Sequence, residues 1–526
     1  MIIINYNNIL FKKSSLLISY ILILISGSLK SQFYNLPNEY FFNTLSQRQL
    51  ARLDTEQLHS SIQPYIPFFN KKYEFVKDTH HVLKYITDDI LLDKVFYDHL
   101  IHIKSKENKY ELKVDPLLNI ELGRAYYDSS KHQNISTNTR GFIASGTIGK
   151  DFYFETMFAE NQSFFPQYIS NFNNQTLIVP GQGRYKTFKT TGYDYAFSSG
   201  FISYQPFKKL NIQLGHGKQK IGNGYRSLLL SDNSFNYPFL KITSQWLKGK
   251  LQYTNIYALL MNLETGGTIT PPSTEPLFQK KALSIQYLSY NFNKRLNVSL
   301  FQGMVWNAAD SMNRQHIDWQ YANPIIFSNL GFYGLNNKNN IVIGANANFK
   351  INNKISIYGQ FMGDDFSNVT KLGNAFGYQV GAKYFDAFGI KNSMIQVEYN
   401  DVAEGSYNSP IGVTSNQSFS HYNQSLAYTL GYGKELVLLI DYKYQRFFIN
   451  AKLNTQWLTL NKVDLYQNTL AKIQIGYTIN TGYNFNVSLG YNYRNQIFSD
   501  IKSSNNKTSF FTLSLKSNLY NTYFDF

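Results

Sequence analysis

The chain has 526 residues, a formal net charge of +16 and no cysteine. The lack of cysteine excludes disulfides, thiol catalysis, iron–sulfur clusters and cysteine-ligated zinc. The positive charge favours anionic lipid headgroups or acidic glycans as partners. Nucleic acid is not expected as a partner, because the sequence has no basic block or known binding module and begins with an export signal.

Residues 1–31 have the pattern of a secretory signal peptide. Lys12 and Lys13 precede the apolar run Leu16–Leu29, and small residues follow. A positive start, a short apolar core and a small-residue exit are the three parts of such a signal. We expect cleavage near Ser31, which leaves Gln32 first. A retained membrane anchor is the alternative, but the run is short of the ~20 residues that a span needs.

Residues 32–111 differ from the rest of the chain. Leu45–Leu58 has helical spacing and good helix formers, and Thr87–His102 begins with a Thr-Asp-Asp start signal. The proline-containing linker Gln63–Pro67 separates these two stretches. We predict a small N-terminal segment with two short helices, either periplasmic or plug-like.

Residues 112–526 read as one amphipathic strand after another. Leu112–Leu122 is apolar at every second position, and the alternation recurs at Leu210–Leu214 and Ile341–Phe349. Successive strand residues point to opposite faces, so this spacing builds a sheet with one apolar and one polar face. Such a sheet, closed with its apolar face outward, is one of the two structures that a bilayer tolerates. We therefore predict an all-β fold: a transmembrane antiparallel β-barrel in the cell outer membrane.

The strands are expected to form hairpins across turns rich in Asn, Gly and Lys. With the first strand, the last strand (Thr508–Leu519) and some that the pattern misses, the total is roughly 16–18, within the range of such barrels. A soluble β-sandwich or propeller is the alternative, although no blade repeat is visible. The expected hairpins are Arg140–Lys150 with Asp151–Asn161, Tyr193–Gln205 with Lys209–Gly217, Pro238–Leu247 with Lys250–Leu263, Lys281–Phe292 with Arg295–Trp306, Asn340–Lys350 with Lys354–Met362, Phe376–Phe385 with Ser393–Asp401, Leu436–Tyr444 with Phe447–Trp457, and Ala471–Ile479 with Asn484–Tyr493.

Short turns alternate with long connections along this region. In outer-membrane barrels the short turns are periplasmic and the long loops are extracellular. The long connections are Ser163–Thr191, Lys218–Tyr237, Glu264–Gln279 and Ala403–Ser425.

Phe524 and Phe526 resemble the C-terminal aromatic signal that the barrel-assembly machinery recognises in many outer-membrane proteins. Their spacing departs from the pattern, because Leu513 and Leu515 share one strand face and both phenylalanines have the other parity. A bulge, or a strand that ends near Leu519, would explain the shift.

No constellation in the sequence predicts an enzyme, a metal site or a cofactor. The glycine-rich stretch Gly215–Gly224 lacks the glycine spacing and the strand–loop–helix context of a phosphate loop. Asp364 and Asp365 follow a strand, where paired carboxylates serve acid–base chemistry or calcium binding, or simply solvate a turn.

The segment Ile221–Ser234 is apolar, flanked by glycine, and contains Tyr225, Arg226 and Asp232. Arginine beside aromatic and carboxylate groups is suited to binding a sugar or an acidic glycan by stacking and charge-assisted hydrogen bonds. The alternative is a loop folded into the barrel lumen and packed there.

Several segments together resemble RemB, a gliding-motility-associated outer-membrane protein family of Bacteroidota. The resemblance extends over nearly all of the mature chain. It is carried by Gly215–Ile242 (GHGKQKIGNGYRSLLLSDNSFNYPFLKI), His59–Tyr65, Asp115–Asn119, Glu160–Gln162, Pro180–Arg184 and Tyr523–Phe526.

More distantly, the chain is similar to the Wzi capsule-assembly barrels. This likeness implies a monomeric barrel that binds surface polysaccharide at its outer face. The RemB resemblance implies a role in cell-surface motility through surface glycans or adhesins, and components of the motility or secretion machinery are expected partners. Outer-membrane lipid is the remaining expected partner. The matching places are Asn339–Asn340, Tyr358–Gln360 with Asp364 and Asp365, and Glu398–Tyr399.

The function expected from the sequence is therefore non-enzymatic. It is the attachment or organisation of surface polysaccharide (capsule or exopolysaccharide), in association with gliding motility, with Tyr225, Arg226, Asp232, Asp364 and Asp365 as glycan-binding candidates. An outer-membrane channel or transporter for a nutrient is the alternative.

Overall fold

A computed structural model of the chain describes residues 47–48, 51, 59–63, 94–107, 109–127, 131–265, 278–310, 313–333, 339–364, 375–409, 416–460, 463–498, 506–517, 519–520 and 522–526. The expected signal peptide with Ser31 and Gln32, and most of the expected helix Leu45–Leu58, lie outside these residues. Asp365 does as well.

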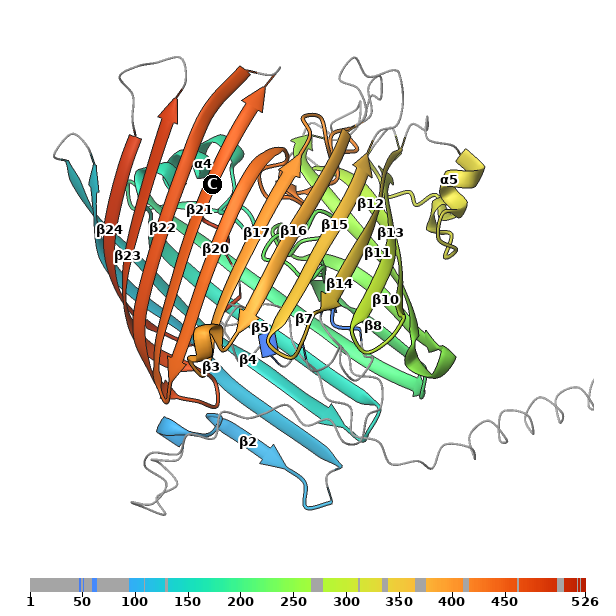
Figure 1. Ribbon diagram of the computed structural model, residues 1–526, viewed down its shortest axis with the longest axis horizontal. Coiled ribbons are helices and arrows are strands. Elements are labelled where there is room, and N and C mark those ends of the chain that lie inside the picture. The colour runs from blue at the N-terminus through green and yellow to red at the C-terminus, as the bar shows by residue number, and fades with distance from the viewer. Residues whose placement is uncertain are drawn as a thin grey trace, which may run out of the picture.

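Within the described residues, 18 antiparallel strands close into a barrel, and β24 pairs with β3 to complete it (Figure 1). All the hairpins expected from the sequence are present. The strands are β3 (Tyr110–Tyr127), β4 (His132–Ile148), β5 (Phe152–Phe164), β7 (Gly192–Phe207), β8 (Leu210–Gly217), β10 (Tyr237–Trp246), β11 (Leu251–Thr265), β12 (Phe278–Asn291), β13 (Leu296–Asn307), β14 (Asn340–Lys350), β15 (Ile355–Asp364), β16 (Ala375–Phe385), β17 (Ser393–Val402), β20 (Gly433–Tyr444), β21 (Phe447–Leu460), β22 (Val463–Asn480), β23 (Phe485–Phe498) and β24 (Asn506–Lys516).

Shorter elements lie at the edges of the barrel wall and in its connections. None of the helices among the described residues combines the length and apolar character that a membrane span requires. The short strands are β1 (Ile62–Gln63), β2 (Ile101–Lys104), β6 (Lys186–Phe188), β9 (Lys220–Ile221), β18 (Ser420–His421) and β19 (Gln424–Ser425), and the helical turns are α4 (Gln167–Thr176), α5 (Ser328–Tyr333), η1 (Leu247–Gly249), η2 (Trp319–Ala322) and η3 (Ala387–Gly389).

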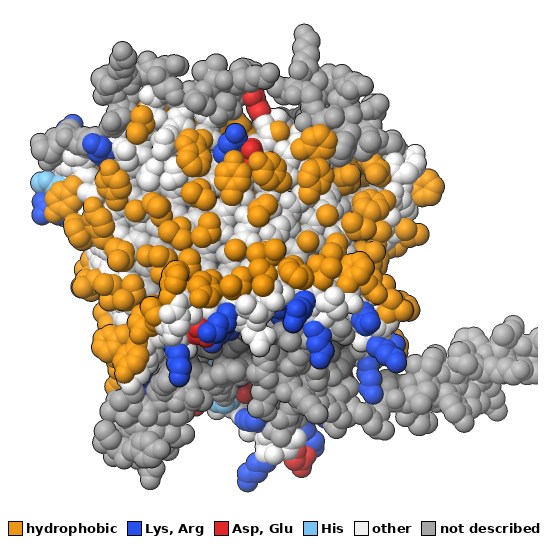
Figure 2. Space-filling view, in the orientation of Figure 1, with side chains coloured by type: hydrophobic (Ala, Val, Ile, Leu, Met, Phe, Trp, Pro, Cys, Tyr) orange, Lys and Arg blue, Asp and Glu red, His pale blue; other side chains and the backbone are white. Residues whose placement is uncertain are grey.

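The outer face of the barrel is a band of apolar side chains (Figure 2). Leu122, Leu214 and Leu489 are exposed there, as the alternation of each strand requires. Lysine and arginine side chains gather along one edge of the band (Figure 2). The short turns between strands carry exposed lysines such as Lys294 and Lys354. Short turns lie at this end and long loops at the other, which makes this end periplasmic.

The predicted helix Thr87–His102 is wrong at its C-terminal end. Only Lys94–Phe96 is helical among the described residues there, and Ile101–Lys104 forms β2, which pairs with β3. The Leu100 main-chain N–H and the His99 ring both hydrogen bond the Asp115 carboxylate of β3, so the wall captures this stretch as a strand. The first strand begins at Tyr110, two residues before the predicted barrel boundary.

The lumen has two unlike halves. Along β10–β15 each strand carries inward apolar side chains, and these form one buried cluster with Ile221, Leu228, Leu229 and Leu230 of a buried loop. We call this the filled half. Along β20–β24 and β3 the inward side chains are mostly polar and border a cavity. We call this the hollow half.

Candidate functional site

The loop between β8 and β10, residues 218–236, folds into the lumen; we call it the luminal plug. Its β9 pairs with β1 of the N-terminal segment. Ser227 Oγ donates to the Ile221 carbonyl at 2.5 Å and accepts from the Leu229 and Leu230 N–H groups, which holds the plug in a tight turn. The apolar side chains of this turn then fill the space between the walls.

Glu398 of β17 binds the main chain of the plug. Its carboxylate accepts from the Tyr225 N–H at 2.7 Å, from the Arg226 N–H at 2.9 Å and from the Tyr358 hydroxyl at 2.8 Å. Gly224 allows this approach, because a Cβ at that position would lie 2.4 Å from Glu398 Oε2. The wall therefore fixes the plug just before its arginine.

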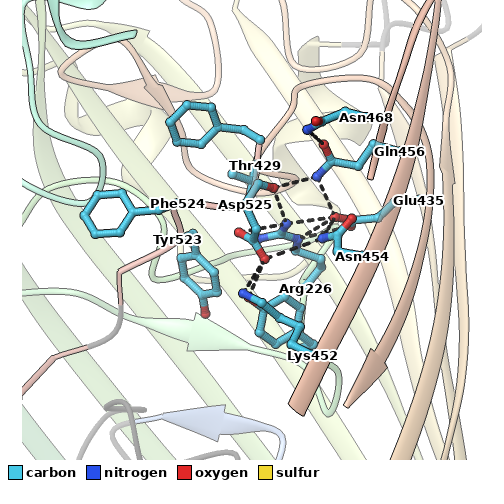
Figure 3. Close-up of polar contacts among 12 residues, drawn as sticks. Arg226, Thr429, Glu435, Lys452, Asn454, Gln456, Asn468, Tyr523, Phe524 and Asp525 are labelled. Atoms are coloured by element: carbon cyan, nitrogen blue, oxygen red, sulfur yellow. Dashed lines mark hydrogen bonds and ion pairs between the residues drawn. The ribbon is translucent and has the colours of Figure 1, made fainter. Parts of the chain in front are cut away.

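Arg226 is held between the wall and the tail of the chain, which we define as residues 519–520 and 522–526 (Figure 3). Its guanidinium donates to Glu435 of β20 at 2.8 and 3.1 Å and forms an ion pair with Asp525 of the tail at 3.2 Å. The Arg226 and Glu435 side chains are 1% and 0% exposed. Asn454 and Gln456 of β21 donate to Glu435, so its carboxylate has further partners.

Asp525 joins the plug, the tail and the wall. It accepts from the Tyr225 hydroxyl at 2.6 Å and pairs with Lys452 of β21 at 2.9 Å. Burial alone would raise the pKa of Asp525, but the charges of Arg226 and Lys452 outweigh it and hold that pKa well below its usual value. Asp525 is therefore a buried carboxylate that is kept ionised by its partners.

Tyr225, Arg226 and Asp232 do not lie on an exposed extracellular loop, and this part of the prediction is wrong. The structure does bring them together, but their contacts are within the protein: Tyr523 of the tail donates to Asp232 at 2.8 Å. The alternative expected from the sequence, a loop packed in the lumen, describes this segment. Its apolar turn is stabilised by burial against the filled half.

Asp364 ends β15 and is buried, where it accepts from the Tyr407 main-chain N–H at 2.5 Å. Tyr407 in turn donates its hydroxyl to the Leu228 carbonyl of the plug at 2.8 Å. Asp364 therefore positions an extracellular loop over the plug and is not a solvated turn residue. Asp365 lies outside the described residues, so the expected carboxylate pair is not described.

Phe524 and Phe526 do not end the last strand, as an assembly signal requires. β24 ends at Lys516, and the tail then contacts the luminal plug and lines the cavity. The Phe526 ring lies 4.4 Å from that of Phe172 in α4, and the Phe524 ring lies 5.7 Å from that of Phe165. The early end of the strand explains why both phenylalanines have the wrong parity.

A cavity of about 310 Å³ lies in the hollow half, beside the tail. Its wall includes cations on four consecutive strands: Lys452, Lys472, Arg494 and Lys516. Lys452 and Lys472 are direct cross-strand partners, an unfavourable arrangement of like charges that nearby anions offset. Carboxylates line the cavity as well: Glu121 pairs with Lys516 at 3.3 Å, Asp525 pairs with Lys452 at 2.9 Å, and Asp441 is the third. The remaining lining includes the amide and aromatic side chains of Asn492, Gln474, Tyr168 and Tyr520.

This lining is suited to an anionic, polyhydroxylated ligand, because it combines cations, amides and aromatic faces. Sequence inspection missed Glu435, Lys452, Lys472 and Arg494. The available signal was a charged residue at an inward position of each predicted strand. Among the described residues, no group of three or more His, Asp or Glu side chains could hold a metal ion.

No protein-family model matches the chain, and no curated protein sequence matches it. The RemB resemblance therefore stays a prediction. Among solved structures, the chain is similar to Wzi, described as an outer-membrane protein involved in group 1 capsule assembly in Escherichia coli and as a carbohydrate-binding β-barrel. The TM-score is 0.50 with 12% identity, over 93% of this chain and 99% of that one.

Two further structures are similar at lower scores. Acinetobacter baumannii OccAB2 has a TM-score of 0.42 and 12% identity, over 77% of this chain and 98% of that one. Pseudomonas aeruginosa OccK9 has a TM-score of 0.42 and 9% identity, over 78% of this chain and 98% of that one. Likeness at such low identity shows the fold alone. The protein is therefore a closed outer-membrane β-barrel that is similar in fold to Wzi.

Proposed function

We propose that this protein is a non-enzymatic, monomeric barrel that binds or organises surface polysaccharide and, as the RemB resemblance implies, serves gliding motility. The observation that carries the proposal is the cationic, amide-rich and aromatic lining of the cavity in the hollow half. Acidic sugars present carboxylates and hydroxyls, which are the groups that such a lining binds. The fold likeness to Wzi, described as carbohydrate-binding, supports the same conclusion.

The luminal plug supports a binding role over free passage of solutes. It is joined to the wall through Glu398 and Glu435 and to the tail through Asp525, with all of these contacts buried. Moving the plug out of the lumen would separate these buried ion pairs, because their two members lie on the plug and on the wall or the tail. A barrel closed in this way is a rigid support for a ligand that stays bound.

The first test is binding of an acidic polysaccharide, polygalacturonate, to the purified full-length barrel, with neutral dextran for comparison. We expect Lys472→Gln and Arg494→Gln each to weaken polygalacturonate binding about tenfold, because each removes a charge-assisted contact. Added salt should weaken wild-type binding as well. Lys354→Gln, in an exposed periplasmic turn, is the matched control and should bind like the wild type.

If all three variants bind polygalacturonate with equal affinity, or if binding does not depend on salt concentration, the cavity is not the glycan-binding site. Arg226→Ala is a poor probe of contact, because Arg226 is buried among protein partners and its loss perturbs the plug.

The association with motility needs a cellular test. Deleting the gene and measuring surface spreading and retained polysaccharide on the same cells separates the two roles. Loss of both supports polysaccharide anchoring that serves gliding. Lost spreading with intact polysaccharide would instead point to an adhesin or to a partner in the motility machinery, against the Wzi-like role.

The row of cations across β21–β24 favours a second candidate, a channel for small anionic solutes. This candidate predicts anion-selective conductance in planar bilayers. A barrel that does not conduct would eliminate it.

A further inference from the structure

The connection between β13 and β14 lies against the outside of the barrel wall. Figure 1 shows α5 beyond the strands, next to β13. We call residues 313–333, which contain η2 and α5, the outer flap. The hydroxyl of Tyr253 on β11 donates to the Pro324 carbonyl, and the ring of Trp306 on β13 lies 5.7 Å from that of Tyr321. The outer flap therefore contacts β11, which is not one of the two strands that it connects, and folds back against β13.

The strand faces beneath the outer flap can be assigned from burial. Leu283 and Ile285 of β12, and Phe301 of β13, belong to the apolar cluster of the lumen. Because side chains alternate along a strand, Gln286 and Gln302 point away from the lumen, toward the membrane. Both are fully buried although they face outward.

These glutamines are part of a polar row across three strands. Asn255 of β11 pairs in register with Gln286 of β12, and Gln286 pairs with Gln302 of β13. The amide of Gln302 donates to Gln286 at 3.0 Å. Leu300, two residues from Gln302 on the same face, is exposed in the apolar band. The polar row therefore lies at the level of the band, where lipid offers no hydrogen bonds.

The outer flap supplies hydrogen bonds that lipid lacks. The Asn323 carbonyl accepts from the Gln286 amide at 3.0 Å, and the Tyr321 carbonyl accepts from the Ser284 hydroxyl at 3.1 Å. Ser284 lies on the same outward face as Gln286. The flap thus covers polar groups on the outside of the wall with its own main chain.

The other side of the outer flap is apolar. Trp319, Ile325 and Phe332 are 76%, 64% and 75% exposed. Residues 319–333 contain no charged residue and no histidine, whereas Arg314, His316 and Asp318 precede them. Exposed apolar side chains without a charge between them indicate a contact surface, and here they continue the apolar band.

We infer that the outer flap is a membrane-embedded element: its main chain covers the polar row Asn255–Gln286–Gln302, and Trp319, Ile325 and Phe332 contact lipid acyl chains. The charged residues 314–318 then lie toward the lipid headgroups. The flap thereby shields the polar side chains of the wall from lipid, and its own apolar side chains anchor the barrel in the membrane. This inference does not depend on the proposed function.

The absence of cysteine in the chain makes a direct test simple. Trp319→Cys, Ile325→Cys and Phe332→Cys are each spin-labelled in the full-length barrel in lipid nanodiscs. Collisions are measured with oxygen, which concentrates in lipid, and with a water-soluble nickel chelate. Leu300→Cys is the lipid-facing control and Lys354→Cys is the aqueous control. We expect the three flap labels to favour oxygen, as Leu300→Cys does.

Labels that favour the nickel chelate, as Lys354→Cys does, would overturn the inference. Protection from both reagents would overturn it too, because the flap would then be covered by a second copy of the chain rather than by lipid.

The covering role has a separate test. Replacing residues 319–333 with a glycine–serine linker exposes the polar row and should lower the ratio of folded to unfolded barrel in lipid vesicles by about tenfold. Folding is followed by the shift in gel mobility on heating. Adding Gln286→Leu and Gln302→Leu to the linker variant should restore folding. A linker variant that folds like the wild type, or no restoration by the leucines, would contradict the covering role.

Discussion

The filled and hollow halves of the lumen are built from the same alternating strands but reach opposite outcomes. In the filled half, inward residues such as Ile285, Val305 and Val342 belong to one buried cluster with Leu229 of the luminal plug. In the hollow half, the inward positions carry residues such as Lys472, and a cavity remains beside them. Strand periodicity therefore decides which residues face inward, and the chemistry of those residues decides whether the lumen becomes a core or a site.

The boundary between the two halves is ionic. Arg226 belongs to the plug, Glu435 to the wall and Asp525 to the tail, and the three meet where the apolar packing ends. Lys452 extends this cluster toward the cavity. The cluster therefore couples the stability of the filled half to the position of the tail that borders the hollow half.

Arg226→Met would break this boundary and should have the largest effect. It leaves Glu435 and Asp525 buried with fewer partners, which we expect to cost about 3–5 kcal/mol of unfolding free energy. The measurement is unfolding of the reconstituted barrel in denaturant. Arg314→Met removes an exposed Arg–Asp pair and should cost less than ~1 kcal/mol. Equal costs for the two variants would contradict the role given to the buried cluster.

Leu229→Ala tests the core-like character of the filled half. Leu229 is fully buried, and its side chain fills space above Gly344, so we expect a loss of about 3 kcal/mol from transfer and cavity terms. Leu214→Ala, on the lipid-facing side of β8, is the matched leucine control and should cost far less. A small effect of Leu229→Ala would show that the plug is loosely packed, and the contrast between the halves would weaken.

Acid should destabilise the boundary through Asp525. The pKa of Asp525 is lowered in the folded protein, so its contribution to stability is fully present above the unfolded pKa of ~3.9 and is lost as the pH falls toward the folded pKa. We expect unfolding free energy to fall below about pH 4. The unfolding free energy of the Asp525→Asn variant should decrease less steeply over the same pH range. If the wild type and the variant show the same pH dependence, Asp525 is not its cause.

Lys472→Gln should have the smallest effect on stability, with the opposite sign. It removes one member of the cross-strand Lys452–Lys472 pair, so we expect a gain of a few tenths of a kcal/mol, at the low end of the range for such pairs. The same variant is expected to weaken binding of an acidic polysaccharide. A loss of stability instead would mean that Lys472 supports the wall rather than a ligand.

The local pattern of the sequence was sufficient to predict most of the barrel strands. The hairpin expected at Lys281–Phe292 and Arg295–Trp306 matches β12 and β13 closely, because side-chain alternation and an Asn-Lys turn are both encoded within a few residues. The prediction of a helix at Thr87–His102 was wrong at its C-terminal end, because pairing of Ile101–Lys104 with β3 overrode the local helical spacing.

The candidate site was predicted only in part. The sequence marked Tyr225, Arg226 and Asp232 as unusual, and these residues do form one cluster. Their partners were not predictable, because Arg226 meets Glu435 at a separation of 209 residues and the Asp525 carbonyl at a separation of 299. Contacts at such separations arise only when the barrel closes and the plug and tail enter it.

The sequence by itself determined the β class, the strand order, the outward apolar band and the alternation of short turns with long loops, because each follows from spacing between near neighbours. Only the tertiary structure decided that residues 218–236 and the tail turn inward, that the outward residues Gln286 and Gln302 are covered by the outer flap, and that one half of the lumen stays hollow. Those outcomes depend on side chains from distant strands that share one enclosed space, where burial and charge pairing act between residues that the sequence keeps apart.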